Sequence, residues 1–204
     1  MHIVDGVVAT PVLITSTVLA LSGVAVGLKR LESEAIPKVA LLSAAFFVAS
    51  LIHIPVGPVS AHLILTGLMG LILGWAVFPA VLIGLLLQAL FFGFGGVSVL
   101  GINTLNMALP AVFCHYLFLR GSTRVALNGF LAGMSAIGLS GLMVAATLGM
   151  SGEEFLLAAK LLLVGQIPLM LIEGAITAAS VSLLFKVRPD IFVLAPVRLT
   201  NEAA

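Results

Sequence analysis

Residues 7–28 read VVATPVLITSTVLALSGVAVGL, an unbroken apolar segment with no charged side chain. A helix of about 20 such residues spans the hydrocarbon core of a bilayer. The whole chain shares this character, because 61% of its 204 residues are hydrophobic and only 8% are charged. Soluble domains carry about 25% charged residues, which cover their water-facing surface. The sequence therefore predicts an all-α integral membrane protein built from apolar helices.

Apolar runs separated by short polar or glycine-rich stretches predict a bundle of about seven transmembrane helices. Their expected bounds are 11–28, 36–54, 62–77, 80–93, 106–119, 125–148 and 155–185. The third and fifth are short, so we expect one or both to be half-helices or tilted segments that line a cavity. We find no internal repeat, and we expect one transmembrane metal-binding domain over residues 1–188, followed by a cytoplasmic tail of residues 189–204.

The placement of charge predicts the orientation of the chain in the membrane. Signal peptides carry positive charge before their apolar core, whereas here Asp5 precedes the first run and Lys29 and Arg30 follow it. We therefore expect Met1 to begin the mature chain. With the N-terminus outside and the C-terminus cytoplasmic, every basic residue except Lys160 falls on the cytoplasmic side, as the positive-inside rule requires. A multi-pass protein of the inner (plasma) membrane is expected, and the formal charge of +1 gives no reason to expect nucleic acid.

A histidine at the second position suggests a chelate formed with the terminal amine. From Met1, the amine nitrogen and the amide and ring nitrogens of His2 can wrap one ion, because a terminal amine loses its proton at modest cost. A fourth ligand could come from His62, which the expected topology places on the same side, as it does His53. Such planar nitrogen ligation favours Ni(II) or Cu(II), and Co(II) uses similar donors. The alternative is that these are incidental interface histidines.

Four ordered stretches of the chain resemble one family of metal transport proteins. They are MHIVDG (residues 1–6), PVGPVSAHLILTGL (55–68), QALFFGFGGVSVLGINTLNMALP (88–110) and IPLMLIEGAITA (167–178). Each is similar to a motif of the CbiM/NikM proteins, the substrate-binding S components of energy-coupling factor (ECF) transporters for cobalt and nickel. The resemblance covers most of the chain.

The resemblance implies a ligand set and a mode of work. The transported Ni(II) or Co(II) would be held in a square plane by the Met1 amine, the amide and ring nitrogens of His2, and His62. Two departures concern the metal preference, because His53 stands where the family often has asparagine and Gln166 where many members have histidine. His53 could therefore be an additional or transient ligand, or an interface residue that only forms hydrogen bonds.

The resemblance also implies partners and no catalytic activity in this chain. An S component works with a transmembrane coupling (T) subunit, two cytoplasmic ATPase subunits and often a small additional membrane subunit. The absence of a GxxxxGK[ST] phosphate-binding loop agrees with energy arriving from another polypeptide. No resident cofactor is expected, since the metal ion would be cargo.

Five other polar residues are candidates for a supporting role. Glu173 is the one acid deep inside an expected helix, where it could support the metal loop or form a structural hydrogen bond with backbone. Asn103, Asn106 and, less clearly, Gln88 could orient His62 or satisfy the backbone of an outer loop. Asp5 could hold the terminal segment in place or cap the first helix.

Three other functions remain open from the residues alone. A secondary transporter or channel for a small organic solute would use midplane polar groups, for which Glu173 and Gln166 are the candidates, and would be indifferent to His2. A membrane hydrolase would need a nucleophile and base, and Ser60 with His62 is weak support. A purely structural subunit would bind no metal.

Overall fold

The computed structural model describes residues 3–56, 59–118 and 124–192 and shows a helical bundle with one short β-hairpin. The α-helices are α1 (Thr10–Lys29), α2 (Ile36–Ala49), α3 (Thr66–Leu73), α4 (Val77–Phe92), α5 (Leu100–Phe118), α6 (Val125–Ser151) and α7 (Leu156–Val187). Short 3₁₀ turns are η1 (Ser33–Ala35), η2 (Gly74–Ala76), η3 (Glu153–Phe155) and η4 (Pro189–Ile191). The hairpin pairs β1 (His53–Val56) with β2 (Val59–His62) in antiparallel register.

Within the described residues, four helical segments are long and apolar enough to cross a bilayer. They are Thr10–Lys29, Thr66–Phe92, Val125–Ser151 and Glu153–Val187. Prolines fall inside α5 (Pro110) and α7 (Pro168) without ending either helix. The chain is a multi-pass membrane protein.

The expected third and fourth helices are not separate. In the part of the chain that the structure describes, α3, η2 and α4 run on as one bent segment, so six continuous helical segments replace the expected seven. The bend lies at Gly74, whose φ of 53° is readily adopted by glycine and rarely by other residues. Two expected bounds were also wrong, because α2 ends at Ala49 instead of residue 54 and α3 begins at Thr66 instead of residue 62.

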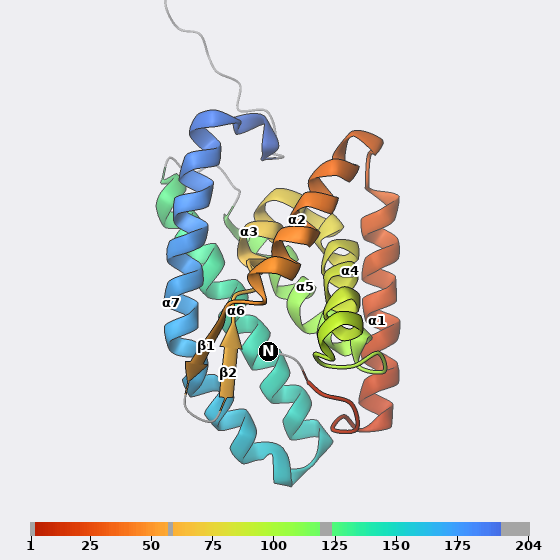
Figure 1. Ribbon diagram of the computed structural model, residues 1–204. Helices are drawn as coiled ribbons and strands as arrows, with labels where there is room; N and C mark the ends of the chain where they lie inside the picture. The colour runs from red at the N-terminus through yellow and green to blue at the C-terminus, as the bar shows by residue number, and fades with distance from the viewer. Residues whose placement is uncertain (1–2, 57–58, 119–123, 193–204) are drawn as a thin grey trace, which may run out of the picture.

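The hairpin explains both errors, and in the described part of the chain it is a short non-helical element within the expected all-α bundle. The intervening sequence HIPVGPVSAH contains Pro55, which has no N–H to continue a helix, and a Gly–Pro dipeptide typical of turns. The hairpin lies beside α7, at the end of the bundle opposite the α1–α2 connection (Figure 1).

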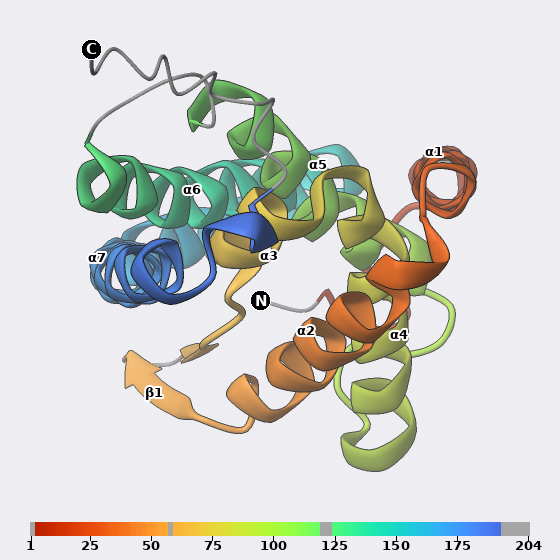
Figure 2. The ribbon, with the colours of Figure 1, turned by 90° about the horizontal axis from the view of Figure 1, so that it is seen from above.

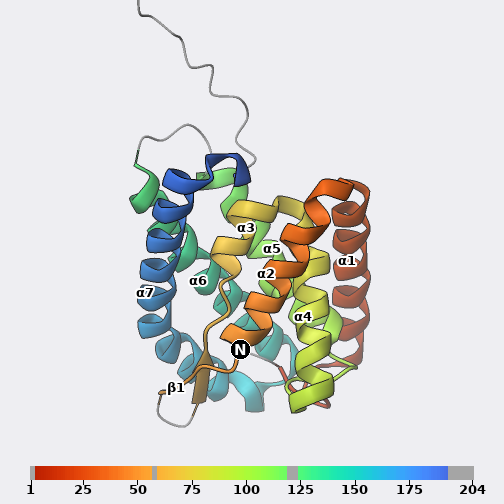
Figure 3. The same ribbon diagram turned by 45° about the horizontal axis from the view of Figure 1, so that its top comes forward.

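The helices surround α3 and α5, which lie in the middle of the bundle (Figure 3). The antiparallel pair α6 and α7 forms one side, and α1 stands at the opposite edge when the bundle is seen from above (Figure 2). The inner face of α1 carries only small buried residues, namely Ser16, Ala20, Gly23 and Gly27. Its outer face is apolar and exposed, as expected of a helix that faces lipid.

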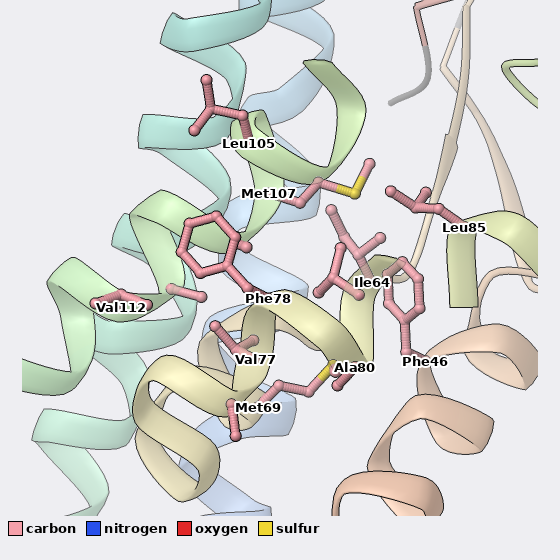
Figure 4. Close-up of a cluster of buried hydrophobic side chains, with 14 of the residues drawn as sticks. Phe46, Ile64, Met69, Val77, Phe78, Ala80, Leu85, Leu105, Met107 and Val112 are labelled. Atoms are coloured by element: carbon pink, nitrogen blue, oxygen red, sulfur yellow. The ribbon is translucent and has the colours of Figure 1, made fainter. Parts of the chain in front are cut away.

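The main hydrophobic core joins the middle helices to the segment between β2 and α3. Figure 4 shows Ile64 from that segment close to Met107 of α5, Phe46 of α2 and Leu85 of α4. Ile64 and Phe46 are completely buried. This core therefore connects the backbone just after His62 to three helices.

We predict that Gly70→Ala destabilises the bundle. A Cβ at Gly70 in α3 would overlap the backbone of Ala111 in α5, so the two helices would have to separate. Forcing an extra methyl group into a packed contact costs about 1–3 kcal/mol. Thermal unfolding in detergent should show the loss.

Gly149→Ala in α6 is the matched control, because a Cβ there makes only an ordinary 3.6 Å contact with Leu156. We expect this substitution to leave the unfolding temperature unchanged or slightly raised, since alanine favours helix. Equal effects of the two substitutions would contradict the close α3–α5 contact.

Candidate functional site

His62 lies at the last position of β2, where the chain turns inward toward α3. Its side chain is only 4% exposed. The imidazole lies nearly parallel to the ring of Phe94, with an interplanar angle of 6° and a centroid separation of 6.3 Å. The His62 imidazole is therefore enclosed by the protein and lies beside an aromatic ring.

The hairpin brings a second histidine into register with His62. His53 and His62 are direct cross-strand partners at the open end of the β1–β2 ladder. The sequence placed them at the ends of two helices on the same side, and the structure places them on neighbouring strands instead. Directly opposed residues in an antiparallel pair have Cβ atoms about 4.5–5.5 Å apart. The two positions are therefore close neighbours in the fold.

Phe94 reaches His62 because of how α4 ends. Gly93 follows the helix in the left-handed conformation, with φ of 66°. The N–H of Phe94 then donates to the carbonyl of Gln88 at 3.3 Å, which closes the turn. Phe94 was not among the residues expected to contribute to the site, although the glycines around it in GFGG indicate such a turn.

The N-terminal segment is clamped inside the bundle by one asparagine. The N–H of Ile3 donates to Oδ1 of Asn103 at 3.1 Å, and Nδ2 of Asn103 donates to the carbonyl of Ile3 at 3.0 Å. Ile3 is 4% exposed and Asn103 2%. The expectation that Asn103 and Asn106 lie in a loop was wrong, because α5 begins at Leu100 and both are helical. Asn103 nevertheless satisfies backbone groups, those of the N-terminal segment.

Asp5 fastens the same segment to the loop after α4. Its N–H donates to the carbonyl of Gly95 at 3.1 Å, and its carboxylate accepts a hydrogen bond from the hydroxyl of Ser98. Gly96, at φ of 132°, lies so close that a Cβ there would overlap this carboxylate. The first helix has no side-chain cap. Asp5 therefore holds the segment and does not cap α1.

Two buried amides have unsatisfied polar atoms. Among the described residues, neither Nε2 nor Oε1 of Gln88 has a hydrogen-bond partner, and neither has Nδ2 of Asn106. Gln88 is fully buried and Asn106 is 2% exposed. A buried unpaired amide costs about 1–3 kcal/mol, so these groups are suited to bind a polar ligand or water.

The remaining predicted residues have separate environments. Glu173 is fully buried in α7 and accepts hydrogen bonds from the backbone N–H groups of Ile64 and Leu65, an interaction of the structural kind considered from the sequence. Gln166, 3% exposed, packs against Gly141 of α6. His115 lies 3.0 Å from the carbonyl of Gly70, where α3 meets α5.

Met1 and His2 lie outside the described residues, so the structure does not describe the predicted chelate. In the portion that is described, no group of three or more His, Cys, Asp or Glu side chains forms a metal site. What the structure does establish is a buried His62, a clamped segment that starts at Ile3, and unpaired amides in the same bundle.

Comparison with known proteins identifies relatives over most of the chain. The family described as "Cobalt uptake substrate-specific transmembrane region", CbiM, matches residues 2–191. One relative is a Haemophilus influenzae protein that is provisionally named as a metal transport protein. It is 48% identical over 198 residues, which cover 94% of this chain and 96% of the relative. The cobalt transport protein CbiM of Sorangium cellulosum is 33% identical over 211 residues, 94% of each chain.

A fused relative and a solved structure extend these similarities. A protein of Archaeoglobus fulgidus, provisionally named as the fused nickel transport protein NikMN, is 30% identical over 199 residues, 94% of this chain and 68% of its own. A crystal structure of a transition metal transporter superposes with a TM-score of 0.78 at 25% identity, covering 92% of this chain and 93% of that one.

We predict that Asn103→Leu releases the N-terminal segment. The substitution removes both hydrogen bonds to Ile3 and leaves its N–H and carbonyl buried without partners, at a cost of about 1–3 kcal/mol for each group. Hydrogen exchange at the Ile3 amide should become much faster.

The control is Asn128→Leu, which removes a side-chain hydrogen bond to the carbonyl of Phe118 in another part of the bundle. Exchange at Ile3 should keep its wild-type rate in this variant. Wild-type exchange at Ile3 in Asn103→Leu would show that the clamp does not order the segment.

Proposed function

The chain belongs to the CbiM family of cobalt-uptake transmembrane proteins, and on that premise we propose that it is the metal-capturing membrane subunit of an ECF-type importer for Ni(II) or Co(II). The ion enters from outside, is bound near the start of the chain, and is released inward when partner subunits hydrolyse ATP. The observation that supports this most directly is the two-sided clamp on Ile3, which fixes the chain one residue after His2 inside the bundle.

The proposed ligands are the Met1 amine, the amide and ring nitrogens of His2, and the His62 imidazole. Ile3 and His62 are both buried, so the two segments that carry the proposed ligands are held in the protein interior. Helix α5 connects these two arms of the site, because it carries Asn103, which binds Ile3, and Met107, which packs with Ile64. Four nitrogen donors in a plane suit Ni(II), and Co(II) accepts the same donors.

Supporting roles follow from the described contacts. We assign the positioning of the N-terminal segment to Asn103 and Asp5, through their hydrogen bonds to it and to the loop after α4. The unpaired amides of Gln88 and Asn106 are assigned to the hydration or outer contacts of the bound ion.

The energy source in this proposal lies in other subunits: a transmembrane coupling subunit, two cytoplasmic ATPases and a small additional membrane subunit. The chain has no phosphate-binding loop of the GxxxxGK[ST] type, and this subunit is assigned no catalytic reaction. Relatives named as the fused proteins NikMN and CbiMQ support association with further membrane components, because these names join two components in one chain.

The proposed orientation puts the hairpin outside and the C-terminus inside. Lys29 and Arg30 lie at the α1–α2 connection, at the end of the bundle opposite the hairpin (Figure 1). The positive-inside rule assigns that end to the cytoplasm. Residues 1–188 would then form the transmembrane domain and residues 189–204 a cytoplasmic tail.

A secondary transporter that binds an organic solute at Glu173 is the less favoured alternative. The Glu173 carboxylate already accepts hydrogen bonds from two backbone N–H groups, and its side chain is fully buried. A solute would have to displace those bonds. The family membership points to a metal ion as cargo.

We predict that a Gly-Ser-Gly extension before Met1 abolishes tight Ni(II) binding. The free amine is then four residues away from His2 and can no longer close a small chelate ring with its amide and ring nitrogens. The loss in affinity should exceed the roughly 10–100-fold that follows removal of a group which only orients a metal ligand. Calorimetry with NiCl₂ on detergent-solubilised protein with an authentic Met1 provides the reference. A yellow, diamagnetic adduct would indicate planar coordination.

The matched control adds Gly-Ser-Gly after Ala204, and its affinity should equal that of the unextended protein. His62→Ala should weaken binding while leaving the protein folded. Unchanged affinity after N-terminal extension would refute the terminal chelate.

We also predict that His53→Ala changes metal preference without removing binding. If His53 supplements the site from the opposite strand, its loss should alter the ratio of Co(II) to Ni(II) affinity by about tenfold, the usual range for a residue next to a metal ligand. His115→Ala, at a distant part of the bundle, is the control. An unchanged ratio of Co(II) to Ni(II) affinity would show that His53 contributes only to the hairpin and not to metal selection.

A further inference from the structure

Glu173 is paired with the backbone just after His62. Its Oε1 accepts hydrogen bonds from the N–H groups of Ile64 and Leu65, the latter at 3.0 Å, and Oε2 also accepts from Leu65 at 3.1 Å. Two successive N–H groups directed at one anion form a nest. In a membrane interior both a carboxylate and free N–H groups are costly, so each satisfies the other.

The bonded turn has an unusual backbone conformation. Leu65 has a φ of 53° and is the only non-glycine residue with positive φ in the described part of the chain. Its carbonyl accepts from the N–H of Met69 at 2.9 Å, so the turn is also the start of α3. A leucine keeps this conformation when its surroundings enforce it, and the Glu173 carboxylate is the polar group that binds the turn.

The Glu173 carboxylate is carried by α7, which packs closely with α6 and, through α6, with α3. Gly67 of α3 lies directly against the backbone of Gly133 in α6, with no room for a Cβ. Gly133 in turn lies against the backbone carbonyl of Glu173. Because α3, α6 and α7 meet backbone to backbone here, the position of the carboxylate relative to the turn is fixed.

The turn determines where the imidazole lies. Only Leu63 separates His62 from the bonded Ile64, and the side chains of Leu63 and Ile64 are both buried, at 7% and 0% exposed. The connection is one residue long and contains no glycine, so the position of Ile64 constrains that of His62. On the other side, His62 is held by its β1 partner and by Phe94.

We propose that Glu173 is a positioning residue for metal capture: its carboxylate holds the turn at Ile64 and Leu65 and thereby fixes His62 as a metal ligand. This inference rests on the function proposed above. In this proposal Glu173 does not bind the metal ion, and its described hydrogen bonds are to the backbone of the turn. Its effect on binding is therefore exerted entirely through His62.

A double-mutant cycle in calorimetric Ni(II) affinity tests this assignment on protein with an authentic Met1. Glu173→Gln keeps the shape but replaces one acceptor oxygen with a donor, so the turn loosens. We expect a loss in affinity of about tenfold or more, as for other groups that orient metal ligands. In the His62→Ala background, which retains the Met1 and His2 nitrogens, the same substitution should change affinity by less than about twofold, because the two effects are not independent.

Thr177→Val is the matched control, since Thr177 is also fully buried in α7, one turn further on, and its hydroxyl has no hydrogen-bond partner among the described residues. Its Ni(II) affinity should remain at the wild-type value. The absorption spectrum of the Ni(II) adduct of Glu173→Leu should approach that of His62→Ala, a shift that general destabilisation would not produce. Should Glu173→Leu fail to fold, the cycle with Glu173→Gln decides alone.

Three results would overturn the inference. Additive losses in the cycle would show that Glu173 acts independently of His62. Wild-type affinity in Glu173→Gln would show that the carboxylate does not position the ligand. A wild-type protein with an authentic Met1 that binds no Ni(II) would instead refute the proposed function, and this inference with it.

Discussion

Non-helical backbone inside a membrane protein must find hydrogen-bond partners without water, and the candidate site is organised by that constraint. Ile3 obtains its partners from the Asn103 side chain. The two strands of the hairpin bond to each other, and the turn at Ile64 and Leu65 bonds to Glu173. Each irregular segment is thus held by a polar group on a helix or by another strand. The same contacts that make these segments tolerable in the membrane also fix the arms that carry the proposed ligands.

The helices were predictable because length and hydropathy depend only on neighbouring residues. The expected segments 11–28, 125–148 and 155–185 correspond to α1, α6 and α7 with small shifts at their ends. The hairpin was missed although Pro55 and the Gly–Pro dipeptide in residues 53–62 favour a break, because two strands pair only through contacts that a hydropathy pattern does not contain. The joining of α3 and α4 was missed for a related reason, since glycine indicates a possible break and not its geometry.

The partners of the buried polar residues could be predicted only in kind. Asp5 was expected to hold the terminal segment or to cap a helix, and the first role is the one observed. Asn103 was expected to serve backbone, but its partner, Ile3, is far away in sequence and cannot be found from spacing. The position of Phe94 beside His62 was not predicted, because a single phenylalanine in an apolar chain has no distinguishing pattern. The ligand set of Met1, His2 and His62 remains a prediction.

The stripe of small residues on α1 determines how this helix can evolve. Its inner face approaches the ring of Phe78 at Gly23 and the backbone of Trp75 at Gly27, where even a methyl group would collide. Its outer face contacts no other part of the described bundle, and leucine, isoleucine and valine are interchangeable there. Sequence drift in α1 should therefore follow a helical period, with free exchange of apolar residues outward and near invariance inward. Hydropathy averaged over the helix would record no change while this selection operates.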